Sequence, residues 1–246
     1  DPDYPGNKGL VAAWVAVPEL AAGLTLFDLI NTGRGNARHG TLTNGPTWVN
    51  GPTGGAALSF DGANDYVPIT LDLSAYSQIT VSFWLKWTGY SNGYNMAAEL
   101  TTNAGGNPGG FALCPSCATL GGVWSIYALG SGGGFGERCF SRPSAGKWHH
   151  FVFPLDVGVT GANFAPAAYV DGQSVSLTTV SNNGGTGTFA NSTLYMMSRA
   201  GSTLFGGGAL SAFFIQSGLA TAASALDLYD QSRREWGQSE QYRWLD

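Results

Sequence analysis

One nine-residue segment, Ile79–Trp87, constrains the fold of this chain more than any other part of its sequence. Its letters are ITVSFWLKW, and every second residue from its first to its last is large and apolar. The intervening residues are polar or charged, except for Trp84. A period of two is typical of a β-strand that buries one face. The segment therefore predicts a long strand that carries an indole ring on its second face.

Further strand patterns occur along the whole chain, and turn-forming dipeptides separate them. Asp171-Gly172 lies between two short apolar runs and predicts a hairpin, because both residues tolerate the positive φ angles of a two-residue turn. Many short strands with frequent turns indicate an all-β fold, a two-sheet antiparallel β-sandwich of the jelly-roll type. The other strands are expected at Leu10–Val17, Ala57–Phe60, Tyr66–Ile69, Val123–Ala128, Lys147–Phe153, Ala167–Val170, Ser174–Leu177, Thr193–Met197 and Ala209–Gln216.

A single helix is expected, at Ala222–Trp236, with Thr221 as its N-cap. Apolar residues recur at helical spacing there, so one face can pack on the sandwich. No linker divides the sequence, which predicts a single domain over residues 1–246, with a tail at 237–246. The stretches Ser91–Gly110 and Gly130–Gly136 are rich in Gly and are expected to be loops.

Composition narrows the class of protein. The chain has 37 Gly, only 11% charged residues and a net charge of −5, so its surface is covered mainly by neutral polar groups. With 11 Lys and Arg in 246 residues and no basic stripe, nucleic-acid binding is not expected. No apolar run approaches the ~20 residues of a membrane helix, so membrane insertion is not expected either. The chain starts at Asp1 without Met or an apolar leader, which processing or trimming would explain.

Six segments, in order, resemble the laminin-G-like jelly-roll domains of the concanavalin A-like lectin/glucanase superfamily, of the stand-alone type found in bacterial and phage-like genomes. The resemblance implies the same sandwich fold and a role in binding glycans or proteins, in extracellular proteins or on virions. The matching segments are Gly9–Trp14, His39–Trp48, Leu58–Val67 (LSFDGANDYV), Ile79–Trp87, Gly146–Val152 (GKWHHFV) and Tyr169–Gly172 (YVDG).

The glucanases of this superfamily carry paired acids in an E-x-D-x-x-E pattern on one strand, and the sequence has no such pattern. Glycoside hydrolysis needs two carboxyl groups at a defined separation. Each of the five glutamates lacks a second acid two residues away: Glu19, Glu99, Glu137, Glu235 and Glu240. The sequence therefore predicts a non-catalytic module, with a polysaccharide hydrolase or lyase as an alternative.

Aromatic residues are the candidates for a sugar-binding platform, because the apolar face of a pyranose packs on aromatic rings. Two of them lie in the expected loop after the long strand, where binding residues are often found. The alternative for Trp84 is that another element covers it. The candidate ligand-binding residues are Trp84, Tyr90, Tyr94, Trp124 and Tyr127.

Two acids and three cysteines have alternative interpretations. Asp61 and Asp65 are possible calcium ligands, although Asp61-Gly62 also suits a turn in which the carboxylate accepts backbone N–H groups. No cofactor is required by any motif. The three cysteines have several possible states. Cys139 can form a disulfide with either Cys114 or Cys117, all three can be free thiols, or, less well, they can contribute to a zinc site.

Two adjacent histidines, His149-His150, lie in an expected strand and therefore point to opposite faces, so they cannot form one site together. A structural role is expected for both. A Ser-His-Asp triad is not excluded by the residues present, but no nucleophile-elbow motif accompanies them.

The sequence thus predicts a surface-exposed interaction module that binds glycans and is extracellular or on a virion surface. A virion structural protein, either a capsid-decoration or a fibre component, is the alternative, with protein partners and assembly into a larger particle. Aromatic and Arg residues in the C-terminal region suit such an interface, or pack on the chain's own sandwich. These interface candidates are Arg233, Trp236, Tyr242 and Trp244.

Overall fold

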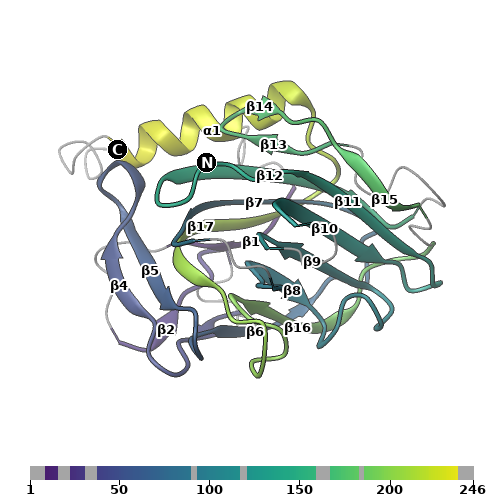
Figure 1. The fold of residues 1–246 in the computed structure, drawn as a ribbon, viewed down its shortest axis with the longest axis horizontal. Helices are drawn as coiled ribbons and strands as arrows, with labels where there is room; N and C mark the ends of the chain where they lie inside the picture. Colours follow the sequence, from purple (N-terminus) through teal and green to yellow (C-terminus); the bar gives the residue numbers. More distant parts are fainter. Residues whose placement is uncertain are drawn as a thin grey trace.

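The structure is a computed structural model that describes residues 9–15, 23–30, 38–89, 93–116, 121–158, 167–182 and 186–237. Within these ranges, two large antiparallel sheets pack face to face and one helix lies on the outside (Figure 1). The predicted all-β sandwich with one C-terminal helix is confirmed.

The first sheet has eight strands, in the spatial order β14-β13-β12-β7-β17-β5-β4, with β1 also pairing with β17. Its long central strand is the alternating segment identified in the sequence. The strands are β1 (Leu10–Trp14), β4 (Thr47–Asn50), β5 (Ala56–Asp61), β7 (Gln78–Trp87), β12 (Trp148–Asp156), β13 (Tyr169–Val170), β14 (Gln173–Ser174) and β17 (Gly207–Ser217).

The second sheet has seven strands, in the order β15-β11-β10-β9-β8-β16-β6. A separate pair, β2 (Thr25–Leu26) and β3 (Gly40–Thr41), and a short 3-10 helix, η2 (Pro52–Gly54), complete the β-rich part. The strands of the second sheet are β6 (Val67–Asp72), β8 (Ala98–Leu100), β9 (Gly110–Cys114), β10 (Val123–Leu129), β11 (Phe135–Ser141), β15 (Thr178–Asn182) and β16 (Asn191–Met196).

Four strands of the second sheet were not predicted, namely β8, β9, β11 and β15. The stretch Ser91–Gly110, expected as a loop, contains β8, and Gly130–Gly136 overlaps the start of β11. The strand expected at Ser174–Leu177 ends at Ser174, and β15 begins after three intervening residues, at Thr178. These strands are short or lack clear alternation, and they exist because neighbouring strands supply their hydrogen bonds.

The core lies between the sheets and is dominated by stacked aromatic rings. Phe83 of β7 lies 5.2 Å from Phe213 and 5.6 Å from Phe151, measured between ring centroids. Trp124 of β10 stacks on Phe151 at 4.6 Å and so joins the second sheet to the first. All four side chains are almost completely buried. The rings therefore fix how the two sheets face each other.

The helix α1 (Ala222–Gly237) lies along the outer face of the first sheet, above β12, β13 and β14 in the view of Figure 1. The N-cap prediction is confirmed, since Ser224 N–H donates to Thr221 Oγ1 (3.3 Å) and Thr221 N–H donates to Ser224 Oγ (2.8 Å). Ala225 packs on Val152 and Tyr169 of the sheet. The helix therefore covers an outer surface that would otherwise expose apolar side chains.

Candidate functional site

Trp84 does not form part of an exposed aromatic platform. Its side chain points away from the core, as the alternation predicts, but helix α1 covers it and leaves only 5% of the residue exposed. Trp84 Nε1 donates to Ser232 Oγ (3.0 Å), and the indole lies 5.7 Å from the Tyr229 ring. The prediction that Trp84 presents a ring to a sugar is therefore wrong, and the alternative, coverage by another element, holds.

The other predicted aromatic residues lie on different surfaces. Trp124 is fully buried in the core between the sheets, and Tyr127 is 5% exposed. Trp124 is therefore excluded as a stacking surface, and Tyr127 is mostly covered. Tyr94 is half-buried and packs in the same cluster as Tyr127. Tyr90 lies outside the described residues.

The two candidate calcium ligands serve the backbone instead. Asp61 Oδ1 accepts the N–H groups of Ala63 (2.7 Å) and Asn64 (3.2 Å), which lowers the pKa of the Asp61 carboxyl. Asp65 Oδ2 accepts the N–H of Asp61 (3.0 Å), and burial raises the pKa of Asp65. This is the turn geometry that Asp61-Gly62 suggested. Over the residues that the structure describes, no three His, Cys, Asp or Glu side chains gather as a metal site.

Cys114 and Cys139 are not bonded to each other. Both residues pair with Ser125 of β10, from opposite sides, so two strand spacings, roughly 9–10 Å, separate their Cα atoms. A disulfide needs Cα atoms within about 7 Å. The Cys114–Cys139 pairing is therefore wrong. Cys117 lies outside the described residues, and its pairing with Cys139 stays a prediction.

The adjacent histidines separate onto two faces, as expected. His150 is buried under helix α1 beside Trp84, and burial lowers its pKa to about 3. His149 lies between Asp171, whose Oδ2 is 2.7 Å from Nδ1, and Ser144. Asp171 also accepts the N–H of His150 (2.8 Å), so the predicted hairpin turn is tied to β12.

Three side chains contact one another in the order of a Ser-His-Asp catalytic triad: Ser144, His149 and Asp171. Their other contacts suit a structural role better than a catalytic one. His149 Nε2 lies 3.2 Å from both the hydroxyl and the carbonyl oxygen of Ser144, so the hydroxyl is not its sole partner. The nearby N–H of Gly146 donates to the carbonyl of Trp87 and cannot serve an oxyanion. The imidazole thus joins the turn before β12 to the hairpin after it.

Of the predicted interface residues, Arg233 packs on its own helix. Its guanidinium lies over the Tyr229 ring, 5.2 Å from the centroid. Trp236 lies within α1, and Tyr242 and Trp244 lie outside the described residues. The use of this region for a partner stays a prediction.

The outer face of the seven-stranded sheet carries a second, smaller apolar cluster, called here the outer cluster. It forms because alternate residues of β9 and β10 point away from the core. Tyr94 and Phe135 are half-buried at its edge, so their rings are partly accessible. The cluster comprises Met96, Ala104, Ala112, Cys114 and Tyr127, with Tyr94, Val123, Phe135 and Leu204 packed against them.

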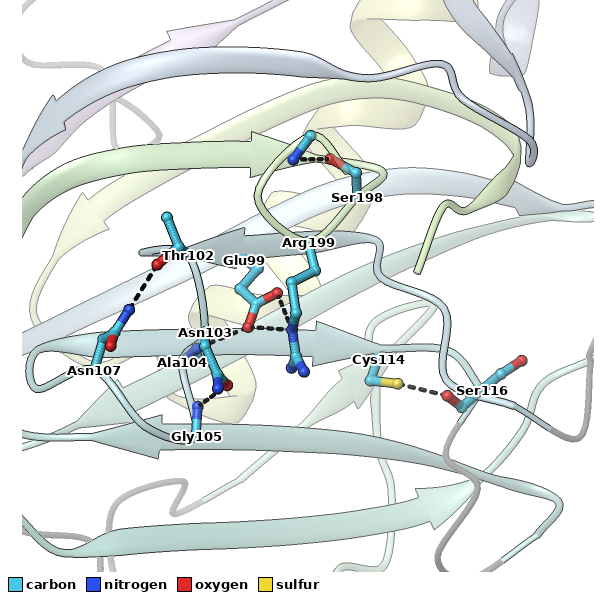
Figure 2. A network of polar contacts seen from close by, with 11 residues as sticks. Glu99, Thr102, Asn103, Ala104, Gly105, Asn107, Cys114, Ser116, Ser198 and Arg199 are labelled. Carbon is cyan, nitrogen blue, oxygen red and sulfur yellow. Dashed lines mark hydrogen bonds and ion pairs between the residues drawn. The ribbon is translucent and has the colours of Figure 1, made fainter. Parts of the chain in front are cut away.

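Beside the outer cluster lies an ion pair that the sequence analysis did not single out. Arg199 Nε donates to both oxygens of Glu99, at 3.1 and 2.9 Å, and Ala104 N–H donates to Glu99 Oε1 at 2.7 Å. Figure 2 shows the Arg199 side chain reaching down past the Glu99 carboxylate, with the end of its guanidinium beyond it. Burial raises the pKa of Glu99, while the Arg199 and Ala104 hydrogen bonds oppose that rise.

One sequence signal for this site existed. Glu99 is one of few charged residues in the chain and follows the apolar run Met96–Ala98, and a charged residue inside such a run needs a partner when buried. Arg199, 100 positions later, could not be identified as that partner from spacing.

Glu99 shares a row of the sheet with a second buried glutamate. The register pairs Glu99 with Ala112, Ala112 with Tyr127, and Tyr127 with Glu137. The Cα atoms of the two glutamates are therefore three strand spacings apart, about 14 Å. Carboxyl groups of glycosidases lie roughly 5–10 Å apart. In this row Tyr127 lies between the two glutamates, so the two carboxyl groups do not form a close acid pair.

Comparison with known structures places the same fold in several binding domains. Domain 4 of AbnA, an extracellular GH43 arabinanase of Geobacillus stearothermophilus solved with arabinotriose, is similar with a TM-score of 0.62 and 18% identity over 89% of this chain and 98% of that domain. The binding domain of Paraclostridial Mosquitocidal Protein 1 gives 0.64 and 13%, over 91% of this chain and 52% of that one.

The ligand-binding domain of botulinum neurotoxin serotype D, solved with N-acetylneuraminic acid, gives a TM-score of 0.61 and 12% identity, over 91% and 51% of the two chains. This chain thus spans about half the length of these toxin domains. No curated protein sequence matches it. In the described part of the chain, no helix has the length and apolar character needed to cross a membrane.

The sequence itself matches a laminin-G-like family model over residues 61–224, which is more than half of the chain. That region includes β6 to β17, the ion pair and the outer cluster. The resemblance seen in the sequence is therefore confirmed, and the chain belongs to the concanavalin A-like lectin/glucanases superfamily.

Proposed function

We propose that this protein is a non-catalytic glycan-binding module that acts on an extracellular surface, and that it binds through the outer face of its seven-stranded sheet. The main supporting observation is the contrast between the two outer faces. Helix α1 covers the part of the first sheet that carries Trp84 and Val152, whereas the outer cluster of the second sheet ends in the half-buried rings of Tyr94 and Phe135. Half-buried rings beside fixed polar groups suit the alternating apolar and polar surfaces of a sugar.

The polar groups of this face suit binding better than turnover. Glu99 is held by Arg199 and Ala104, and Glu137 lies three strands away. A hydrolase would need two convergent carboxyl groups, one of them able to exchange a proton. The fold relatives solved with arabinotriose and with N-acetylneuraminic acid add support for glycans as the ligand class.

The test uses a glycan array followed by titration calorimetry with the best ligand. We expect binding without release of reducing sugar, and Phe135→Ala is expected to weaken it several-fold because an aromatic contact is lost. Leu226→Ala, an exposed site on helix α1, is the matched control and should leave affinity unchanged. Release of reducing ends, or no bound glycan at all, would contradict the proposal.

The alternative to this proposal is a virion structural protein that binds protein partners. Native mass measurement separates them. A symmetric particle with this chain as a stoichiometric component favours the structural protein, and a monodisperse monomer that binds glycans favours the module.

A further inference from the structure

The Arg199 guanidinium has one half engaged and one half open. Its Nε donates to both Glu99 oxygens. Among the described residues, the two Nη atoms have no hydrogen-bond acceptor, and 26% of the side chain is exposed while that of Glu99 is completely buried. The end of the guanidinium therefore offers two parallel N–H donors to an incoming molecule.

The open end is held in a fixed place. The loop that carries Arg199 is closed by hydrogen bonds from Arg199 N–H to the Thr203 carbonyl (2.9 Å) and back from Thr203 N–H (3.2 Å). Ala200 follows with a positive φ of 55°. Gly201 lies against the Tyr66 ring so closely that a Cβ there would be 2.6 Å from it. Because loop and side chain are both held, little conformational entropy remains to be lost on binding.

The Glu99 carboxylate that holds this guanidinium also contacts the outer cluster. Ala104, which donates its N–H to Glu99, is itself buried in that cluster. At the next residue, Gly105, a Cβ would lie 3.6 Å from Cε2 of Phe135. The Arg199 guanidinium and the half-buried Phe135 ring are thus linked through one short turn, Thr101–Asn107. Figure 2 shows the polar residues of this turn.

We propose that the ligand of this face is an acidic sugar whose carboxylate binds the two Nη atoms of Arg199. A planar fork matches the two oxygens of a carboxylate, and such charge-assisted pairs are about twice as strong as neutral hydrogen bonds. Glu99 neutralises the local charge, so recognition depends on fork geometry rather than on a positive field. This inference rests on the proposed glycan-binding function and names its ligand class.

Matched ligand pairs test the carboxylate directly. Titration calorimetry compares 3′-sialyllactose with lactose, and trigalacturonate with its methyl ester, so that sialic and uronic acids are distinguished. We expect the acidic member of one pair to bind at least about tenfold more tightly. Arg199→Lys keeps a positive charge near Glu99 but removes the fork, and it should abolish that preference while the affinity for the neutral member changes less than twofold.

Arg233→Lys, the same substitution on the opposite face, is the control and should keep the preference. Thermal unfolding of each variant checks that it is folded. If neutral and acidic members bind equally, or if Arg199→Lys keeps the preference, the carboxylate inference fails while the module still binds glycans. If no glycan of either kind binds, the proposed function fails and this inference fails with it.

Discussion

At the scale of single residues, His150 has the most unusual environment. It is completely buried between Trp84 and Tyr229, and its Nδ1 has no hydrogen-bond partner in the described part of the structure. A charged imidazolium would lose its hydration there without compensation. The buried ring is therefore neutral, and its pKa falls from 6.5 to about 3.

This shift predicts that the fold loses stability in mild acid. The unfolded chain binds the proton more tightly than the folded chain, so the contribution is complete above pH 6.5 and is lost as pH falls towards 3. At pH 5 the loss is about 2 kcal/mol. Urea unfolding at pH 7 and pH 5 measures it. His150→Phe should reduce the difference in unfolding free energy between pH 7 and pH 5 by that amount. An unchanged difference would refute the assignment to His150.

At the scale of secondary-structure elements, helix α1 determines which outer face stays accessible. Ala225 contacts Val152 and Tyr169, and Ser232 accepts a hydrogen bond from the Trp84 indole. Tyr229 packs on Trp84 and His150. Most helix stability in proteins comes from such packing rather than from propensity. The cap at Thr221 adds to it, because two otherwise unpaired N–H groups are satisfied.

Removing the cap should therefore have a measurable cost. Thr221→Ala is expected to lower the free energy of unfolding by about 1 kcal/mol. Thr221→Ser retains the hydroxyl and should stay within a few tenths of a kcal/mol of the parent chain. Urea titrations followed by tryptophan fluorescence give both values. Equal losses for the Ala and Ser variants would show that the side-chain cap contributes nothing.

At the scale of the whole molecule, the aromatic core joins the two sheets. Phe83 contacts Phe151, Phe153 and Phe213 within its own sheet, and Trp124 of the other sheet stacks on two of those rings. Because interiors are close-packed, a cavity at the centre of this group cannot be refilled by small movements.

Phe83→Ala is accordingly expected to cost about 3–5 kcal/mol in unfolding free energy. Val49→Ala, at an exposed position on the edge strand β4, is the matched control and should change it by less than about 0.5 kcal/mol. Guanidinium unfolding monitored by circular dichroism measures both. A loss below 1 kcal/mol for Phe83→Ala would mean that the core rearranges around the missing ring.

The sequence by itself determined the class of fold, most of the first sheet, the Asp171-Gly172 hairpin and the capped helix. Each of these depends on local patterns: alternation over β7, turn residues with φ values of 52° and 76°, and a hydroxyl at Thr221. The strands β8, β9, β11 and β15 were missed. Three of them have only three to five residues, too few to show a reliable period, and β11 lacks clear alternation.

Only the tertiary structure decided which surfaces are open and which charges meet. Trp84 faces outward, as its strand pattern requires, yet a helix almost 150 residues later covers it. Glu99 and Arg199 are brought together because β8 lies beside β16, which ends just before the arginine loop. Alternation fixes the face on which a side chain lies, but the element that packs on that face comes from distant sequence, and this decides whether the side chain is buried or available to a ligand.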